Sequence, residues 1–84
     1  MSNISLMDEI DLLKYMNNAM NNSYEVLVNN KTIEELLMIQ DINNLVFAHN
    51  IETNNFSKED IENIISYFSE REDFEKCVEL TKLI

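Results

Sequence analysis

The sequence predicts an all-α protein: a compact bundle of about four helices in a single domain, residues 1–84, whose last two helices form a helical hairpin. Three observations support this prediction. The chain has no Gly and no Pro, and sheets with tight hairpins usually need Gly for positive φ, whereas helices can end on Asn. Apolar residues recur at three- and four-residue steps, which is the helical pattern. A chain of 84 residues also makes one domain at most.

The first predicted helix covers about residues 6–28. Ser5 is its expected N-cap, and Asp8 and Glu9 fall in the first turn, where negative charge is favourable. Four asparagines between positions 17 and 22 have poor helix propensity, so the sequence leaves a kink open there, although all but Asn17 project away from the apolar stripe. That stripe consists of Leu6, Ile10, Leu13, Met16, Met20, Tyr24 and Leu27. We interpret Met7, Met16 and Met20 as core filler, with an adaptable contact surface as the alternative.

The second predicted helix covers about residues 33–49. It opens with a capping box, because Glu35 follows Thr32 at the required distance. Projected at 100° per residue, this helix has two apolar faces. The more continuous face carries Met38, Ile39, Ile42, Leu45 and Val46. The opposite face carries Ile33, Leu36, Leu37, Phe47 and Ala48 and is interrupted by Gln40 and Asn44. A helix that is apolar all round must be covered on both sides, by its own chain or by a partner.

Residues 50–55 are expected to form a loop. Ser57 then caps a third helix, whose first turn holds Glu59 and Asp60, and Phe56 with Ile61 makes a hydrophobic staple. Its predicted core stripe is Ile61, Ile64, Ile65 and Phe68. After a break at 70–73, a shorter fourth helix begins at about Phe74. Its expected apolar side carries Cys77, Val78, Thr81 and Ile84, with Leu80 on the border.

Residues 65–84 resemble the helix–turn–helix hairpins of tetratricopeptide repeats and of the UVR motif. In those patterns an aromatic residue follows an acidic turn and a small residue comes three positions later, as Phe74 and Cys77 do here, although Ala is usual where Cys77 stands. The resemblance implies a hairpin whose helices approach closely. No second copy occurs at a period of about 34 residues, so a repeat array is excluded, and no binding residue is carried over.

The charge balance excludes a direct nucleic-acid binder. Sixteen acidic residues against six Lys or Arg give a net charge of −10, and the cations are scattered, whereas phosphate binding needs them clustered. One cysteine cannot form an internal disulfide, so we expect an intracellular protein, cytoplasmic in a bacterial host if the chain comes from a phage. No apolar run approaches the roughly 20 residues of a membrane span, and the acidic start of the chain is unlike a secretory signal.

A catalytic site, a cofactor and a metal centre are not expected. Without Gly there is no phosphate-cradling loop, and the single His49 has no partner at metal-ligand spacing. We interpret His49 as a helix C-terminal residue and Cys77 as a buried, inert thiol, with a nucleophilic thiol as the alternative. The clustered carboxylates lack the loop and the Gly of a calcium site. About half of the acids lie near predicted helix starts, where negative charge is stabilising.

The apolar surplus and the acidity together favour a small protein-binding module, plausibly a phage or mobile-element inhibitor or adaptor of a basic host protein. A structural subunit that forms a homodimer or larger homo-oligomer is the alternative, and a mimic of nucleic acid is third. The residues expected to contact the partner are Tyr15, Leu36, Leu37 and Phe47 as apolar anchors and Glu70, Glu72 and Asp73 as an acidic rim.

Overall fold

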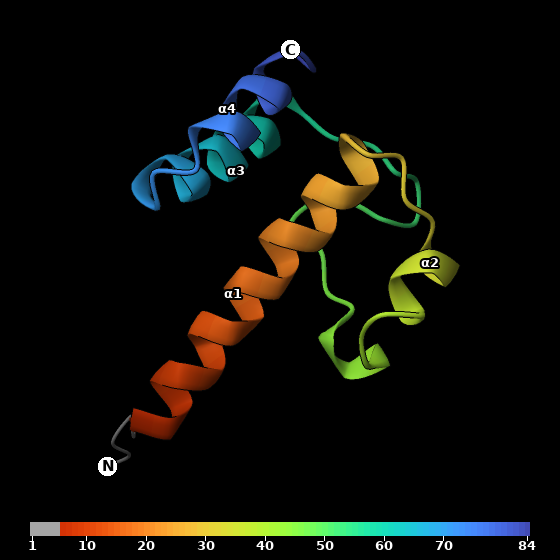
Figure 1. The fold of residues 1–84 in the computed structure, drawn as a ribbon, viewed down its shortest axis with the longest axis vertical. Coiled ribbons are helices and arrows are strands. Elements are labelled where there is room, and N and C mark those ends of the chain that lie inside the picture. The colour runs from red at the N-terminus through yellow and green to blue at the C-terminus, as the bar shows by residue number, and fades with distance from the viewer. Residues whose placement is uncertain (1–5) are drawn as a thin grey trace.

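The computed structural model describes residues 6–84, and Figure 1 shows one long helix with a pair of shorter helices packed near its C-terminal end. Helix α1 (Leu6–Leu27) is continuous over 22 residues, so its asparagines do not interrupt it. Asn21 Nδ2 donates a hydrogen bond to the backbone oxygen of Asn17 at 2.8 Å, along the helix. The predicted N-cap, Ser5, lies outside the described residues.

Helix α2 (Ile33–Leu37) begins as the sequence predicts, because Thr32 and Glu35 form a capping box. Asn30, with φ of 58°, takes the left-handed conformation between α1 and α2 that Asn tolerates better than most residues. The predicted extension of this helix to residue 49 is wrong. α2 ends after five residues, and a short 3₁₀ helix, η1 (Ile42–Asn44), follows with Asp41 as its N-cap.

Residues 45–49 have no helical structure and run back beside α1. Residues 50–55 form the turn that the sequence predicts, closed by an isolated antiparallel bridge between Asn50 and Asn55. Asn54 has a φ of 53° and takes the second left-handed position. Asn therefore performs at both places the role for which many proteins use Gly.

Helix α3 (Lys58–Glu70) and helix α4 (Phe74–Thr81) form the expected hairpin. Ser57 and Asp60 form a capping box at the start of α3. Between the two helices Glu72 has a φ of 60°, and the amide of Asp73 donates to the carbonyl of Phe68 at 2.9 Å. These contacts reverse the chain within three residues, so α3 and α4 pack against each other.

The core lies where α1 meets the hairpin. Its buried side chains come from three helices and are Tyr24, Ile61, Ile64, Tyr67, Phe68 and Leu80. Tyr24 and Phe68 pack edge to face, with ring centroids 5.9 Å apart. The predicted stripe of α3 is confirmed, with Ile65 only partly buried. On α4 the predicted face is wrong: Leu80 is the fully buried residue, and Val78 and Ile84 are exposed.

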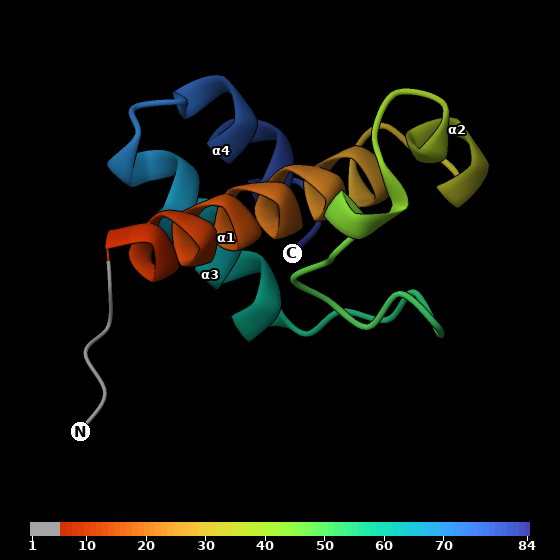
Figure 2. The same ribbon diagram turned by 90° about the horizontal axis from the view of Figure 1, so that it is seen from below.

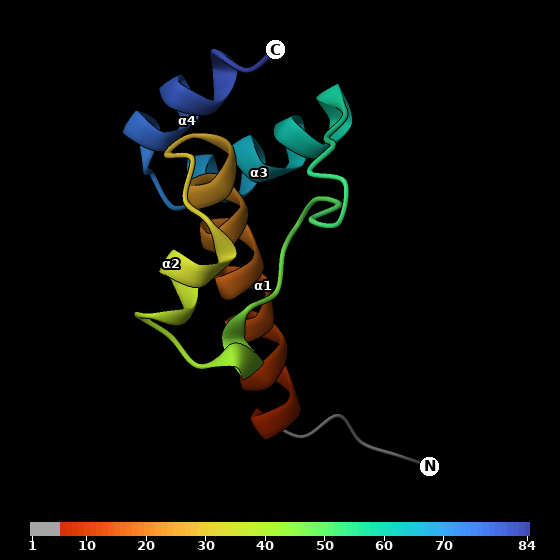
Figure 3. The same ribbon diagram turned by 90° about the vertical axis from the view of Figure 1, so that its right-hand side faces the viewer.

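The described part of the molecule measures 44 × 28 × 21 Å. In Figures 1 and 3 the N-terminal half of α1 extends beyond the α3–α4 hairpin, while α2 and η1 lie on the other side of the long helix. The core therefore covers mainly the C-terminal half of α1. The N-terminal half and the α2–η1 segment contribute most of the exposed apolar side chains, including Leu12 and Met38.

Candidate protein-binding surface

Among the residues whose burial is described, the most exposed large apolar side chains lie between the end of α2 and the start of η1. Met38, Ile39 and Ile42 are 84%, 77% and 68% exposed. Ile33 and Leu37 on α2 are also exposed, at lower fractions. We call these five residues, Ile33, Leu37, Met38, Ile39 and Ile42, the 33–42 surface. The sequence assigned Met38, Ile39 and Ile42 to one continuous face of a longer helix, and no such helix forms.

Side chains of α1 explain why the second helix stops. Asn22 is 4% exposed, and its Nδ2 donates to the backbone oxygens of Asn44 and Val46 at 2.9 and 3.0 Å. Its Oδ1 accepts a hydrogen bond from Nε2 of Gln40 at 2.9 Å. Asn22 projects away from the apolar stripe, as expected, but it is buried against residues 40–46 on the opposite side of α1. Carbonyls that a continuous helix would use internally are bound by α1 instead, which offers the backbone an alternative to the helix.

A second polar network holds the segment that follows. The backbone amide of Ala48 donates to Ser23 Oγ at 2.7 Å, Ser23 Oγ lies 2.7 Å from His49 Nδ1, and His49 Nε2 lies 2.9 Å from Asn54 Oδ1. The Asn54 oxygen can only accept, so His49 donates from Nε2 and its Nδ1 accepts from Ser23. No buried side-chain nitrogen or oxygen of this network lacks a partner, so His49 is a packed, bonded residue and not a helix C-terminal one.

The Ser23–His49–Asn54 order resembles a nucleophile with its base and orienting group, but the burial does not suit catalysis. Ser23 is 0% exposed, so a substrate cannot reach its hydroxyl in this conformation. The ring of Phe47 packs edge to face against His49 with centroids 5.9 Å apart. The arrangement holds residues 48–54 against α1. Such a network stabilises a fold when all of its buried polar groups are hydrogen-bonded, as they are here.

The four predicted apolar anchors, Tyr15, Leu36, Leu37 and Phe47, differ in exposure and position. Leu36 is 1% exposed, so its side chain is not available to a partner, which corrects its assignment as an anchor. Leu37 remains exposed and belongs to the 33–42 surface, whereas Phe47 is half-buried beside His49. α2 buries Leu36 and exposes its neighbour because adjacent helical residues point about 100° apart.

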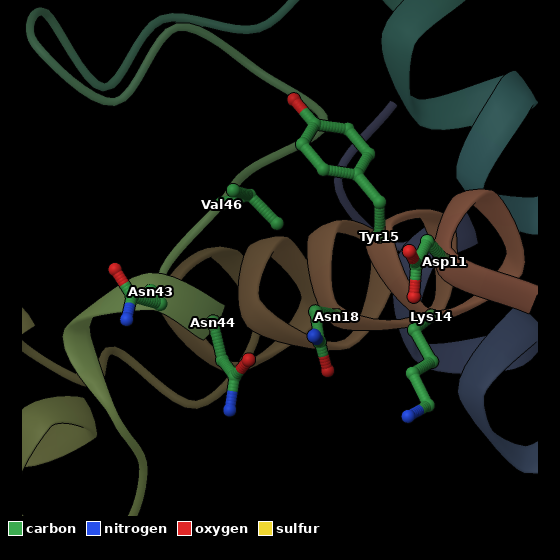
Figure 4. Close-up of a pocket in the computed structure, with 7 residues that line it drawn as sticks. All are labelled: Asp11, Lys14, Tyr15, Asn18, Asn43, Asn44 and Val46. Atoms are coloured by element: carbon green, nitrogen blue, oxygen red, sulfur yellow. The ribbon is translucent and has the colours of Figure 1, made fainter. Parts of the chain in front are cut away.

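Tyr15 lies on α1, near η1. It lines a pocket of about 220 Å³ with Val46 and with polar side chains of α1 and η1: Asp11, Lys14, Asn18, Asn43 and Asn44. Figure 4 shows Tyr15 standing out from α1 on the same side as Val46, with Asn43 and Asn44 on the neighbouring η1. The pocket brings one carboxylate and one ammonium group together with three amides, and none of its lining residues is a nucleophilic Cys or Ser.

The predicted acidic rim lies apart from the 33–42 surface. Glu70 ends α3, and Glu72 and Asp73 lie in the turn before α4. In Figures 1 and 2 this turn and α2 are at opposite sides of the molecule. Asp73 is also occupied: its Oδ2 lies 2.9 Å from Nζ of Lys76. That hydrogen bond holds the pKa of Asp73 below its ordinary value.

The carboxylates close in sequence to the 33–42 surface are Glu34, Glu35 and Asp41. Glu35 accepts hydrogen bonds from the backbone and hydroxyl of Thr32, and the backbone bond is the main reason that its pKa is lowered. Asp41 Oδ1 accepts from the amide of Asn43 at 2.9 Å. The two carboxylates cap α2 and η1 respectively. The turn-forming Asp41 and the Asn43–Asn44 pair were a local signal that the longer helix would break.

Cys77 makes a packing contact between the last two helices. Cys77 is partly buried against the core, and its Sγ donates to the backbone oxygen of Ile65 at 3.4 Å, which brings α4 close to α3. Among the described residues, no group of three His, Cys, Asp or Glu side chains is arranged to hold a metal ion. In residues 6–84, no helix combines the length and the apolar character that crossing a bilayer requires.

Comparison of the chain with protein-family models, with curated proteins and with solved structures finds no match.

Proposed function

We propose that this protein is a small acidic protein-binding module that acts as an inhibitor or adaptor of a protein with a basic surface, and that the 33–42 surface contacts this partner. The observation that supports the proposal is the exposure of Met38, Ile39 and Ile42 within five consecutive residues. Large apolar side chains gathered on one exposed segment are typical of protein contacts. Met adds adaptability, because its unbranched chain fits irregular partner surfaces.

The free energies of burial and association indicate that apolar contact alone does not give a stable complex. Burying each of these three side chains contributes about 1.5–3 kcal/mol. Association costs roughly 4–15 kcal/mol in lost translational and rotational freedom. Three anchors therefore leave little or no net affinity, so a stable complex requires further contacts or favourable electrostatics.

The charge distribution supports a basic partner. The chain carries a net charge of −10. Within the part of the chain that the structure describes, only two ion pairs form, Lys76 with Asp73 and Lys82 with Glu79. Most carboxylates, including the exposed Glu34 beside Leu37, are thus uncompensated. Such a field accelerates association with a cationic surface and opposes contact between two copies of this chain.

Site-specific photo-crosslinking tests the proposal. A benzophenone amino acid replaces Ile39 in the 33–42 surface, and in a control chain it replaces Ser66, which is exposed on α3. We expect irradiation in the source cells to join position 39, and not position 66, to a discrete basic protein. Because exposed charges are screened, raising salt in the lysate from about 50 mM to about 500 mM should lower the yield.

Other outcomes contradict the proposal in different ways. A crosslink between two copies of the chain, together with light scattering that gives a dimer or larger species, favours homo-oligomerisation through the same apolar residues. Displacement of the partner by DNA favours mimicry of nucleic acid. Equal labelling from positions 39 and 66, or none from position 39, shows that the 33–42 surface has no dedicated partner.

A further inference from the structure

The N-terminal half of α1 carries a second exposed apolar surface, separate from the 33–42 surface. Four large side chains follow one another over two turns, with exposed fractions from 39% to 59%; they are Ile10, Leu12, Leu13 and Met16, and we call them the α1 stripe. At 100° per residue they fall within an arc of about 160°. These four residues therefore form an exposed apolar surface on one side of the helix.

The α1 stripe continues the face that packs the core. One and two turns further along α1, Met20 packs against the core cluster and Tyr24 is part of it. The coverage by α3 ends near Asn17, whose Oδ1 accepts a hydrogen bond from the hydroxyl of Tyr67 at 2.6 Å. N-terminal to this contact, none of the helices that the structure describes covers the α1 stripe. A further helix at this position would extend the helical packing along α1.

The charges around the α1 stripe indicate which helix can occupy it. Glu9 lies within the arc of the α1 stripe, three and four residues before Leu12 and Leu13, so it shares their face. The turn between α3 and α4, with Glu70 and Glu72, is on the same side of the molecule as the N-terminal half of α1 in Figures 1 and 2. These three exposed carboxylates form no ion pair with any side chain that the structure describes.

Of the two cations closest in sequence to these acids, Arg71 is engaged within the fold and Lys14 lines the pocket. Arg71 stacks on the ring of Tyr67 at 3.6 Å from its centroid, and its Nη1 donates to the carbonyl of the same residue at 3.1 Å. Lys14 lines the pocket beside Asp11 and Asn44. The surroundings of the α1 stripe are therefore acidic, with carboxylates that remain available to cations of a partner.

We propose that the α1 stripe binds a basic amphipathic helix of a protein partner, whose apolar side packs on Leu13 and its neighbours and whose Lys or Arg side chains face Glu9, Glu70 and Glu72. This is recognition of an amphipathic helix through anchors at helical spacing. A second copy of this chain suits the site less well. Both copies carry the same net charge of −10 and repel each other, whereas a basic helix is attracted to this surface. The inference does not depend on the 33–42 surface.

An NMR titration of the isotope-labelled full chain tests this inference with three synthetic peptides of about 18 residues, long enough for five helical turns. The first is an amphipathic helix of Leu and Lys, the second has the same composition in an order without an apolar face, and the third is an amphipathic helix of Leu and Glu. We expect the first peptide to shift the resonances of Ile10, Leu13 and Met16. It should bind about ten-fold or more tightly than the second, and the third should not bind.

Two matched variants make the test specific. Leu13→Glu places a charge in the α1 stripe, and Ile39→Glu makes the same change in the 33–42 surface. Both positions are exposed, so both variants should fold, which circular dichroism checks. We expect Leu13→Glu to weaken binding of the Leu–Lys peptide about ten-fold and Ile39→Glu to change it less than about two-fold.

The inference is overturned if the Leu–Lys peptide does not bind, if the two Leu–Lys peptides bind equally, or if the shifts fall on residues 33–42. It is equally overturned if Leu13→Glu binds as well as the wild type. Concentration-dependent shifts of the α1 stripe without any peptide would identify a second copy as the occupant. A negative result for the α1 stripe does not contradict the proposal for the 33–42 surface, because that proposal is tested separately by crosslinking at Ile39.

Discussion

Ser23 is the residue through which α1 holds the segment after η1. Its hydroxyl accepts from the amide of Ala48 and lies 2.7 Å from His49 Nδ1, in a fully buried position. Replacing Ser23 by Ala leaves that amide and that ring nitrogen without partners in a site that water does not reach. Each buried group left unsatisfied costs about 1–3 kcal/mol.

We therefore expect Ser23→Ala to lower the free energy of unfolding by about 2 kcal/mol, measured by urea denaturation. Ser66→Ala is the matched control, because Ser66 is exposed on α3, and its effect should stay within about 0.5 kcal/mol. Equal effects of the two substitutions would mean that the hydrogen bonds of Ser23 do not hold residues 48–49 on α1.

At the scale of single elements, the accuracy of the sequence prediction depends on where the determining contacts lie. α1, the start of α2, α3 and the start of α4 are predictable because their signals are local, as the Thr32–Glu35 and Ser57–Asp60 capping boxes show. The end of α2 is only partly predictable: Asp41 and the Asn43–Asn44 pair are local signals, but Asn22, 22 and 24 residues away in the chain, also binds the carbonyls of Asn44 and Val46. Helical periodicity does not report such a distant competitor for backbone groups.

The α3–α4 hairpin contains the contact whose pH dependence is predictable. The hydrogen bond from Lys76 lowers the pKa of Asp73 below its ordinary 3.8, and the same bond raises the pKa of Lys76 above 10.5, although burial opposes that rise. A carboxyl whose pKa is lowered in the folded state adds stability above its unfolded value, and the contribution is lost as pH falls through the lowered pKa. For Lys76 the contribution is complete below 10.5 and is lost as pH rises through the raised pKa.

We expect wild type to be more stable than Asp73→Asn across the neutral range, with a difference in urea midpoint that stays constant from about pH 5 to about pH 9. The difference should shrink when the pH falls below about 4 or rises above about 10.5. Glu75→Gln is the control, since Glu75 is exposed on α4 and should give no such profile. A difference that persists unchanged at about pH 2 would show that the ion pair with Lys76 contributes nothing.

At the scale of the whole molecule, the candidate site is partly predictable. The surplus of apolar residues between 33 and 49 is visible in the sequence, and part of it is exposed, as Met38 and Ile39 show. Tertiary packing decides which of these apolar residues stay exposed. Leu36 is buried and Leu37 is exposed because α2 turns the side of Leu36 toward the rest of the protein. The sequence analysis also assigned the α3–α4 turn and the apolar anchors to one binding site, and the fold places that turn and α2 at opposite sides of the molecule. Such an error is expected, because residues distant in sequence share a surface only through packing.

The net charge of −10 determines how the whole molecule responds to salt. Repulsion among like charges destabilises the folded state, and only two ion pairs, Lys76 with Asp73 and Lys82 with Glu79, oppose it among the described side chains. Salt weakens the repulsion and the exposed pairs alike, but the uncompensated acids are far more numerous. Screening should therefore raise stability on balance.

We expect the thermal unfolding midpoint to rise as NaCl increases from about 10 mM to about 200 mM, over which the screening length falls from roughly 30 Å to below 8 Å. Glu62→Lys replaces an exposed carboxylate on α3 and changes the net charge from −10 to −8. This variant should be more stable at low salt and should gain less from added salt. A midpoint that falls with salt would mean that attractive ion pairs outweigh the repulsion among the carboxylates. The acidic residues would then be neutralised within the fold, and their excess would no longer support a basic partner.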